Sequence, residues 1–206
     1  MKFPEHLTLS FLLAQFGVQQ HYGLAGTALV VIAGNLPDLD TVTILGGPKV
    51  YRKYHRIVGH GLPVTLAGPP LLAQFSSGVL ALPFVPLWIW LQVALLVHLA
   101  TDVCFYRWPV QLLWPLSSRG WGLGLVRWND LVPTLLLCTG TALVLLRPHF
   151  ASAFAAASLG GSVLYLSWRA WWPWPYWGWS AWVTGSWAQD AAPIWRWLTG
   201  DFVRRS

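Results

Sequence analysis

The sequence contains little charge and very little acid. Only 10% of its 206 residues are charged, and only seven are Asp or Glu, whereas a soluble domain usually carries about 25% charged residues. A chain of this length cannot place so much apolar sequence in one core, because a large surface remains to be covered. The scarcity of charge therefore argues against an ordinary soluble domain and favours a protein embedded in a membrane.

Cysteine and clustered basic residues are scarce as well. Cys104 and Cys138 lie far apart and beside or within apolar sequence, so neither a disulfide framework nor a cysteine-based metal site follows from them. The net charge of +6 comes from basic residues scattered between apolar runs, and we therefore expect no nucleic-acid partner. The N-terminal residues do not have the pattern of a signal peptide, and we expect them to form the first helix.

Apolar residues and tryptophan are abundant. Hydrophobic residues make up 55% of the chain, which includes 16 Trp, a residue that prefers the membrane interface. Each apolar run is long enough for about 22 to 30 Å of helix, and the runs fall at roughly 5–20, 23–37, 61–77, 83–102, 131–147 and 150–170. We predict an all-α, polytopic membrane bundle of about six apolar helices over residues 1–170. The Trp-rich remainder, 171–206, is interrupted by Pro and Gly and is predicted to be an interfacial tail.

The basic residues give this bundle an orientation. If all six runs cross, one side holds the N-terminus, the loops 38–60 and 103–130, and the tail. Of the thirteen Lys and Arg residues, all except Arg147 fall on that side. Because basic residues are retained in the cytoplasm, we predict a multi-pass membrane protein with both termini cytoplasmic.

Most of the His residues, and Asp residues that border apolar runs, fall on the same side: His6, Asp38, Asp40, His55, His60, His98 and Asp102. His98 and Asp102 are four residues apart, so a helix presents them on one face. Extended backbone after Pro37 is expected to point the carboxylates of Asp38 and Asp40 the same way. Ionisable residues at membrane depth are costly and indicate function, and this sequence pattern predicts one shared polar cluster.

The composition of the cluster suggests a metal site. Imidazole and carboxylate without thiolate suit zinc, manganese or iron, with zinc ranked first, and two metals about 3.5–4 Å apart are an option. The predicted metal ligands are drawn from His6, Asp38, Asp40, His60, His98 and Asp102. Taken alone, the pair His98 and Asp102 also fits a helical salt bridge, and the basic run 49–56 also fits the positive charge that is typical of cytoplasmic loops.

Three residues are candidates for catalysis. Asp40 is a candidate general base in place of a ligand, His55 is a candidate ligand or acid, and Arg56 is placed to meet a phosphate or an oxyanion.

The motifs, taken in order, resemble a known family. The order is an early His6, then PDLD (37–40), HRIVGH (55–60), HLATD (98–102), and more loosely Pro115 and Ser117. This resembles the LexA-binding, inner-membrane-associated hydrolase family, also called the membrane-bound metal-dependent hydrolases, over about residues 4–130. The resemblance implies a metal-dependent hydrolase of the cell inner membrane. The sequence departs from the family at Gly59 and Gly61, where Thr and Ser are usual, and at Thr41, where a His often stands.

Three functions fit these features. The leading hypothesis is a metal-dependent hydrolase of phosphoester or ester bonds at the cytoplasmic membrane face, with membrane lipids as partners and a lipid or other amphiphile as substrate. The alternative is a small transporter or metal-handling membrane protein, whose polar residues usually continue across the bilayer. The far halves of the expected helices carry almost nothing ionisable, which favours the hydrolase. The third is an inactive scaffold, suggested by the two glycines.

Overall fold

A computed structural model describes residues 3–105, 109–126 and 130–171. Within these ranges the chain is helical, and strand pairing is limited to two isolated bridges, Phe105–Val126 and Val110–Trp121. The predicted interfacial tail lies, apart from its first residue, outside the described residues. The all-α class predicted from the apolar runs is confirmed for the described part of the chain.

The helices follow one another with short connections, except between α5 and α6. Seven α-helices and two 3₁₀ helices are described: α1 (Phe3–Ala14), α2 (Val18–Gly34), η1 (Pro37–Gly46), α3 (Pro48–Tyr54), α4 (Leu62–Leu80), α5 (Phe84–Val103), α6 (Leu131–Leu146), η2 (Pro148–Phe150) and α7 (Ala151–Trp171).

The prediction of about six crossing helices is wrong in number. Two described helices, Phe84–Val103 and Pro148–Trp171, are long and apolar enough to cross a membrane, and a third span results if the bent pair α2–η1 counts as one. The helices formed by the other apolar runs are shorter or more polar than these candidate spans. α1 has 12 residues, which is about 18 Å of helix, and α6 has 16 residues. α4 has 19 residues but contains two internal prolines and several polar side chains near its end.

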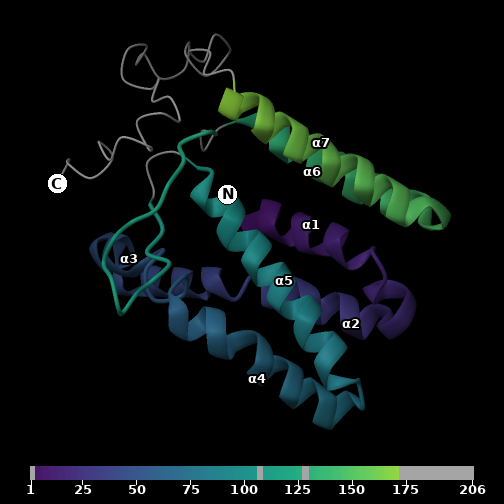
Figure 1. Ribbon diagram of the computed structural model, residues 1–206, viewed down its shortest axis with the longest axis horizontal. Coiled ribbons are helices and arrows are strands. Elements are labelled where there is room, and N and C mark those ends of the chain that lie inside the picture. The colour runs from purple at the N-terminus through teal and green to yellow at the C-terminus, as the bar shows by residue number, and fades with distance from the viewer. Residues whose placement is uncertain (1–2, 106–108, 127–129, 172–206) are drawn as a thin grey trace.

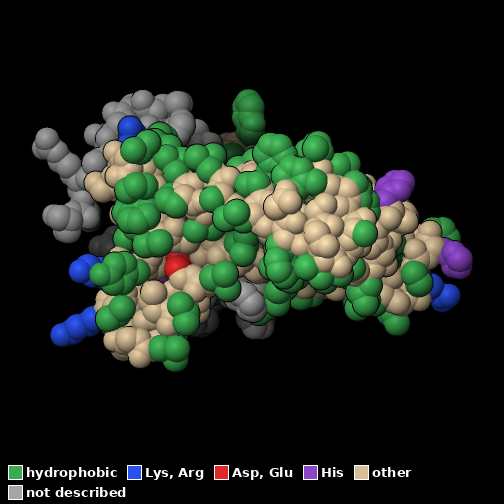
Figure 2. All heavy atoms as spheres, turned by 90° about the horizontal axis from the view of Figure 1, so that it is seen from below, with side chains coloured by type: hydrophobic (Ala, Val, Ile, Leu, Met, Phe, Trp, Pro, Cys, Tyr) green, Lys and Arg blue, Asp and Glu red, His purple; other side chains and the backbone are tan. Residues whose placement is uncertain are grey.

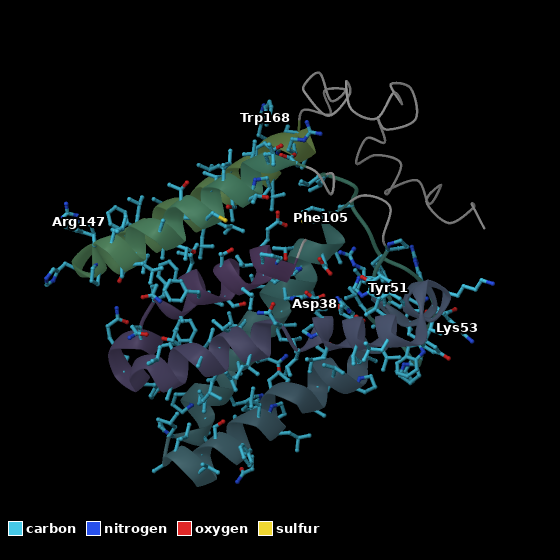
Figure 3. All side chains as sticks on the ribbon, turned by 180° about the vertical axis from the view of Figure 1, so that it is seen from behind. Asp38, Tyr51, Lys53, Phe105, Arg147 and Trp168 are labelled. Carbon is cyan, nitrogen blue, oxygen red and sulfur yellow. The ribbon has the colours of Figure 1, made fainter. Side chains whose placement is uncertain are left out.

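The helices run between two ends of the molecule. In Figure 1 the connections α1–α2, α4–α5 and α6–α7 lie at one end, and α3 lies at the other. Figure 3 shows Lys53 and Arg147 at these opposite ends, with Asp38 on the side of Lys53. The placement of Lys53 and Arg147 at opposite ends matches the separation predicted for these two residues, while the cytoplasmic assignment of either end stays a prediction.

Two hydrophobic clusters form the core, and α1 contributes to both. Ala14 packs with residues of α2, α4 and α5, whereas Leu9 and Leu12 pack with residues of α6 and α7. Close approach of α1 to α2 depends on Gly34, where an added Cβ would lie 2.1 Å from Oγ of Ser10. Small residues at such contacts allow membrane helices to approach closely. This contact places Ser10, one turn after His6 in α1, against the C-terminal end of α2.

The surface is largely apolar. Figure 2 shows hydrophobic side chains over most of one face, basic side chains mainly at one end and histidines at the other, while acidic atoms are visible at a single point. Large side chains such as Leu24, Leu71 and Leu146 are about 70% exposed or more, at 77%, 68% and 73%. Such a surface is expected where lipid is the solvent.

Candidate metal centre

Four separate segments bring the predicted site residues together. His6 comes from α1, Asp38 and Asp40 from η1, and His98 and Asp102 from α5, while His55, Arg56 and His60 lie between α3 and α4. All of them except His55 are buried or nearly so. These residues were predicted to form one cluster because they border apolar runs on the same predicted side of the membrane. The structure brings them together.

The PDLD segment has a different backbone from the one expected. Pro37 occupies the first turn of a 3₁₀ helix, not the start of extended chain, and the axis bends by 59° between α2 and η1. With three residues per turn, Asp38 and Asp40 point in different directions. Asp38 faces His60 and His98, whereas Asp40 faces His55 and the other side of His60. The two acids therefore have separate roles.

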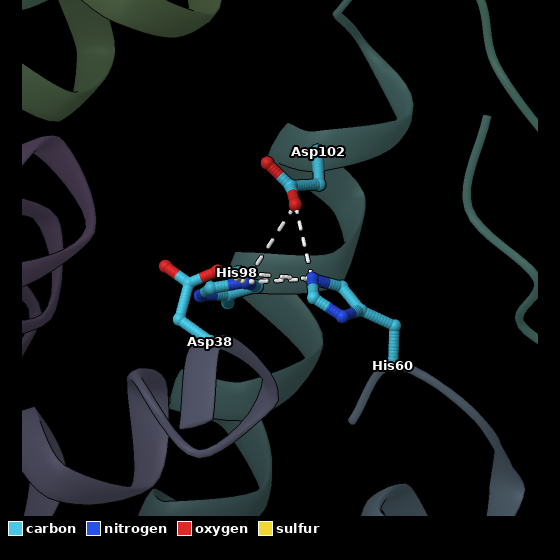
Figure 4. A group of neighbouring side chains, drawn as sticks. All are labelled: Asp38, His60, His98 and Asp102. Atoms are coloured by element: carbon cyan, nitrogen blue, oxygen red, sulfur yellow. Dashed lines mark hydrogen bonds and ion pairs between the residues drawn. The ribbon is translucent and has the colours of Figure 1, made fainter. Parts of the chain in front are cut away.

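Four side chains surround one common volume, as Figure 4 shows for Asp38, His60, His98 and Asp102. One donor atom from each lies within 4.8 Å of the others. The Nε2 atom of His60 lies 3.1 Å from Oδ2 of Asp102 and 3.4 Å from Nε2 of His98. Oδ1 of Asp38 lies 3.8 Å from Nε2 of His98 and 4.0 Å from Nε2 of His60. Two ligands of one tetrahedral zinc ion lie about 3.3–3.6 Å apart, so the set has the size of a metal site.

The other ring nitrogens fix how the two histidines face this volume. Nδ1 of His98 lies 2.6 Å from the carbonyl oxygen of Gly34, and because a carbonyl only accepts, Nδ1 carries the proton. Nδ1 of His60 lies 3.2 Å from Oδ2 of Asp40, and a neutral His60 that donates there also presents a lone pair at Nε2. Metal-binding histidines are commonly oriented by such a hydrogen bond from the second nitrogen. The donor chemistry therefore fits a divalent cation.

The net charge of the cluster also favours a bound cation. Three buried carboxylates, from Asp38, Asp40 and Asp102, face one guanidinium, from Arg56, which leaves two negative charges when the histidines are neutral. Burial disfavours a charged His60, but hydrogen bonds to Asp102 and Asp40 outweigh burial and raise its pKa above the usual value. The position between the carboxylates thus favours positive charge, which a proton or a metal ion can provide.

A second group of contacts holds the four donors in place. Both oxygens of Asp40 have partners: Oδ1 lies 2.7 Å from Nδ1 of His55, and Oδ2 accepts from the backbone N–H of Arg56 at 2.8 Å. Asp40 is therefore placed to orient His60 and His55. Its role as a ligand or a general base stays a prediction, and in this structure its oxygens contact His55, His60 and the backbone of Arg56.

Arg56 and His6 both hold the carboxylate of Asp102. The Nη2 group of Arg56 donates to Oδ1 of Asp102 at 3.0 Å, and Nε2 of His6 lies 3.1 Å from the same oxygen. The ring of His6 also stacks on His98, with centroids 3.6 Å apart. Arg56 was predicted to meet a phosphate and His6 to be a ligand. Here the guanidinium is 3% exposed and paired with Asp102, and His6 contacts Asp102 and His98 without being one of the four donors.

The two glycines that depart from the family pattern are explained by close packing. A Cβ at Gly59 would lie 2.1 Å from the carbonyl oxygen of Pro37, and one at Gly61 would lie 2.8 Å from that of Trp114. The His60 segment therefore lies directly against the backbone of η1 and of the 109–126 loop. Position 59 needs a glycine because any side chain there would meet the carbonyl of Pro37. The difference from the family pattern at Gly59 is therefore compatible with the geometry of the site.

Several site contacts were not foreseen from the sequence. The carbonyl of Gly34 orients His98, and the ring of Tyr51 stacks on His55 with centroids 4.5 Å apart. The carbonyl of Arg56 accepts from the N–H of Gln111 at 3.1 Å, which ties the 109–126 loop to the site. Backbone contacts leave no side-chain signal, whereas Tyr51 could have been suspected from its spacing of four residues from His55 on a helix.

The fold and the site together define a helical membrane protein with a buried His/Asp cluster. The YdjM inner membrane protein family matches residues 1–189, and the chain belongs to that family. This agrees with the LexA-binding membrane family that the motifs resemble.

One relative of the chain is YfhP, an uncharacterized protein of Bacillus subtilis (strain 168), which is 31% identical over 107 residues. The match covers 50% of this chain and 32% of YfhP, so the chain spans about a third of that relative's length. No solved structure matches the chain.

Proposed function

We propose that this protein is a metal-dependent hydrolase of phosphoester or ester bonds, with its site at the cytoplasmic face of the inner membrane. The observation that carries the proposal is the arrangement of Asp38, His60, His98 and Asp102 around one buried volume with excess negative charge. A divalent cation held there, zinc by preference, supplies Lewis acidity that polarises an ester oxygen and acidifies water.

The neighbouring His55 is the candidate for moving the proton. Its Nδ1 lies 2.7 Å from Oδ1 of Asp40, so Asp40 holds the ring in the tautomer whose Nε2 is basic. Orientation of an imidazole by a carboxylate is the usual arrangement for a general base. In the hydrolysis, the oxygen of water forms the new bond to phosphorus or carbonyl carbon. The ester bond to the leaving oxygen breaks, and His55 passes the proton of water to that oxygen.

Asp102 and Arg56 have supporting roles in this proposal. Arg56 and His6 hold Oδ1 of Asp102, which directs Oδ2 toward His60 and the common volume. Arg56 therefore positions a ligand, and its pairing leaves the role of substrate contact to other groups. A buried charge pair of this kind is costly to break because the remaining buried charge loses its oppositely charged partner.

Hydrolysis of small esters tests the proposal. Full-length protein, purified in detergent and supplied with zinc, manganese or ferrous iron, is assayed with p-nitrophenyl phosphate, bis-p-nitrophenyl phosphate and p-nitrophenyl acetate. We expect metal-dependent hydrolysis of at least one of them, and a loss of about 10²–10⁴-fold in His55→Gln with metal still bound. The His21→Gln variant is the control. Metal binding without hydrolysis of any of the three contradicts the proposal.

The alternative is a transporter or metal-handling protein that uses the same cluster. Metal uptake into proteoliposomes distinguishes it, because a transporter moves the ion across the bilayer whereas a hydrolase retains it. Among the described residues at the opposite end, the ionisable side chains include His21, Arg147 and His149, which are exposed, and they do not continue the cluster toward that end.

A further inference from the structure

The 3₁₀ helix η1 has one apolar row that points away from the metal centre. With three residues per turn, side chains three apart lie above one another. Leu39, Val42 and Leu45 form such a row and are 66%, 63% and 85% exposed. The two other rows carry Asp40, which is buried against His55 and His60, and Asp38, which faces His98. We call Leu39, Val42 and Leu45 the η1 row.

Exposed lysines follow the η1 row directly. α3 begins two residues after η1 ends, and its Lys49 and Lys53 are exposed. They are four residues apart and therefore lie on one side of the helix. An apolar face beside basic side chains is the pattern of a segment that lies in the membrane interface, where the apolar part enters the acyl boundary and the basic part meets anionic headgroups.

The geometry of η1 suits this position. The segment by itself has 10 residues, which is too few to cross a bilayer, and it turns from α2 by 59°. The backbone that exposes Leu39 also carries Asp38 and Asp40 on either side of it. A lipid that contacts Leu39 therefore lies against the same turn of backbone that carries Asp38 and Asp40.

We propose that η1 and α3 form a docking surface for anionic phospholipids and that the substrate of the metal centre is the headgroup ester of such a lipid. The η1 row enters the acyl boundary, and Lys49 and Lys53 bind headgroup phosphates. The substrate assignment rests on the proposed hydrolase function. The docking surface does not, because it uses residues outside the metal centre.

Depth and lipid preference test the docking surface without any reaction. Full-length protein in which Cys104 and Cys138 are replaced by Ser is labelled at Val42→Cys and placed in nanodiscs of phosphatidylcholine and phosphatidylglycerol. A nitroxide at this position is expected to be relaxed more by oxygen than by a water-soluble nickel chelate. A fluorophore at the same position is expected to be quenched more strongly by chain-labelled phosphatidylglycerol than by equally labelled phosphatidylcholine.

The lysines provide the matched comparison. Replacement of Lys49 and Lys53 by Gln is expected to reduce the preference for phosphatidylglycerol at position 42 by up to about fivefold per lysine at low salt. A probe at Leu146→Cys, at the opposite end, is expected to show no change in the same variant. Equal quenching by both lipids at position 42 contradicts the proposal. So does a label that is reached mainly by the nickel chelate, or one shielded from both reagents by a second copy.

The substrate class has its own test, which separates it from the proposed function. Metal-supplied protein in nanodiscs is assayed with phosphatidylglycerol and phosphatidic acid in the disc, and with glycerol phosphate in solution. Preferential hydrolysis of a lipid, reduced in the Lys49→Gln, Lys53→Gln variant, is the expected result. Equal or greater hydrolysis of glycerol phosphate overturns the substrate class and leaves the hydrolase intact. Docking without any hydrolysis overturns the hydrolase and the substrate assignment, and leaves the docking surface standing.

Discussion

The Nε2 atoms of His60 and His98 face each other at 3.4 Å, while the Nδ1 atom of each ring is held by a different acceptor. With both rings neutral, two lone pairs point into one volume that also contains carboxylate oxygens of Asp38 and Asp102. Such an arrangement is unfavourable unless a cation lies between the groups. A bound cation is therefore expected to depend on these four donors and on the contacts that position them.

The Asp40→Asn variant tests whether Asp40 orients ligands or is one itself. If Asp40 orients the ligands, its replacement removes hydrogen bonds that position His60 and His55. Metal affinity is then expected to fall by about 10–100-fold, while binding remains measurable. Competition with a fluorescent zinc chelator gives the affinity. Asp38→Asn is the comparison, because loss of a ligand is expected to weaken binding more than loss of Asp40. A greater loss in Asp40→Asn than in Asp38→Asn contradicts the assigned roles.

Arg56 is predicted to position Asp102 and not to bind substrate. Its backbone lies in the left-handed region, with φ of 63°, and its guanidinium is paired with Asp102. Arg56→Gly relieves the backbone but leaves a buried carboxylate without that partner. We expect a net loss of stability on the order of 3 kcal/mol, measured by unfolding in detergent, together with weaker metal binding. Unchanged stability and metal affinity with a raised KM alone would instead indicate substrate contact.

Gly59 is predicted to be required for the approach of the His60 segment to η1. In Gly59→Ala the added methyl meets the carbonyl of Pro37, and we expect a loss of about 1–3 kcal/mol of stability with reduced metal affinity. The control is Gly78→Ala, where a Cβ on α4 meets nothing within 4 Å and helix propensity favours Ala. A Gly59→Ala protein as stable as Gly78→Ala, with normal metal binding, contradicts the packing account.

Both predicted cytoplasmic loops are expected on one side of the membrane, because they contact each other in the structure: the N–H of Gln111 donates to the carbonyl of Arg56, and the N–H of Leu62 donates to that of Trp114. Reporter fusions after residues 55 and 115 should therefore both report the cytoplasm, where most of the basic residues are predicted to lie, and a fusion after Arg147, at the opposite end of the molecule, should report the other side. Fusions at residues 55 and 115 that report different sides would contradict the orientation.

The sequence was most informative where a periodic or repeated chemical pattern was present. The motifs containing Asp38, His60, His98 and Asp102 predicted a shared cluster, and helical spacing correctly placed His98 and Asp102 on one face. The number of spans was overestimated because apolar composition does not show where a helix ends: the run 5–20 contains the end of α1 at Ala14. The separate roles of Asp38 and Asp40 could not be predicted, since they depend on the 3₁₀ backbone after Pro37. The support given by the carbonyl of Gly34 depends on tertiary packing alone.

The metal content of the purified protein decides whether the His/Asp cluster is a metal site. Three full-length proteins are purified in parallel from cells grown with zinc, manganese and iron, and their metal content is measured by elemental mass spectrometry. They are the wild type, a double variant that carries Asp38→Asn and His98→Gln, and a control double variant that carries His21→Gln and His149→Gln. We expect at least about one metal ion per chain in the wild type and in the control. The variant changed at Asp38 and His98 is expected to be nearly free of metal, and all three proteins are expected to fold in the membrane. A folded, metal-free wild type, or equal metal in both double variants, would contradict the assignment of a metal site.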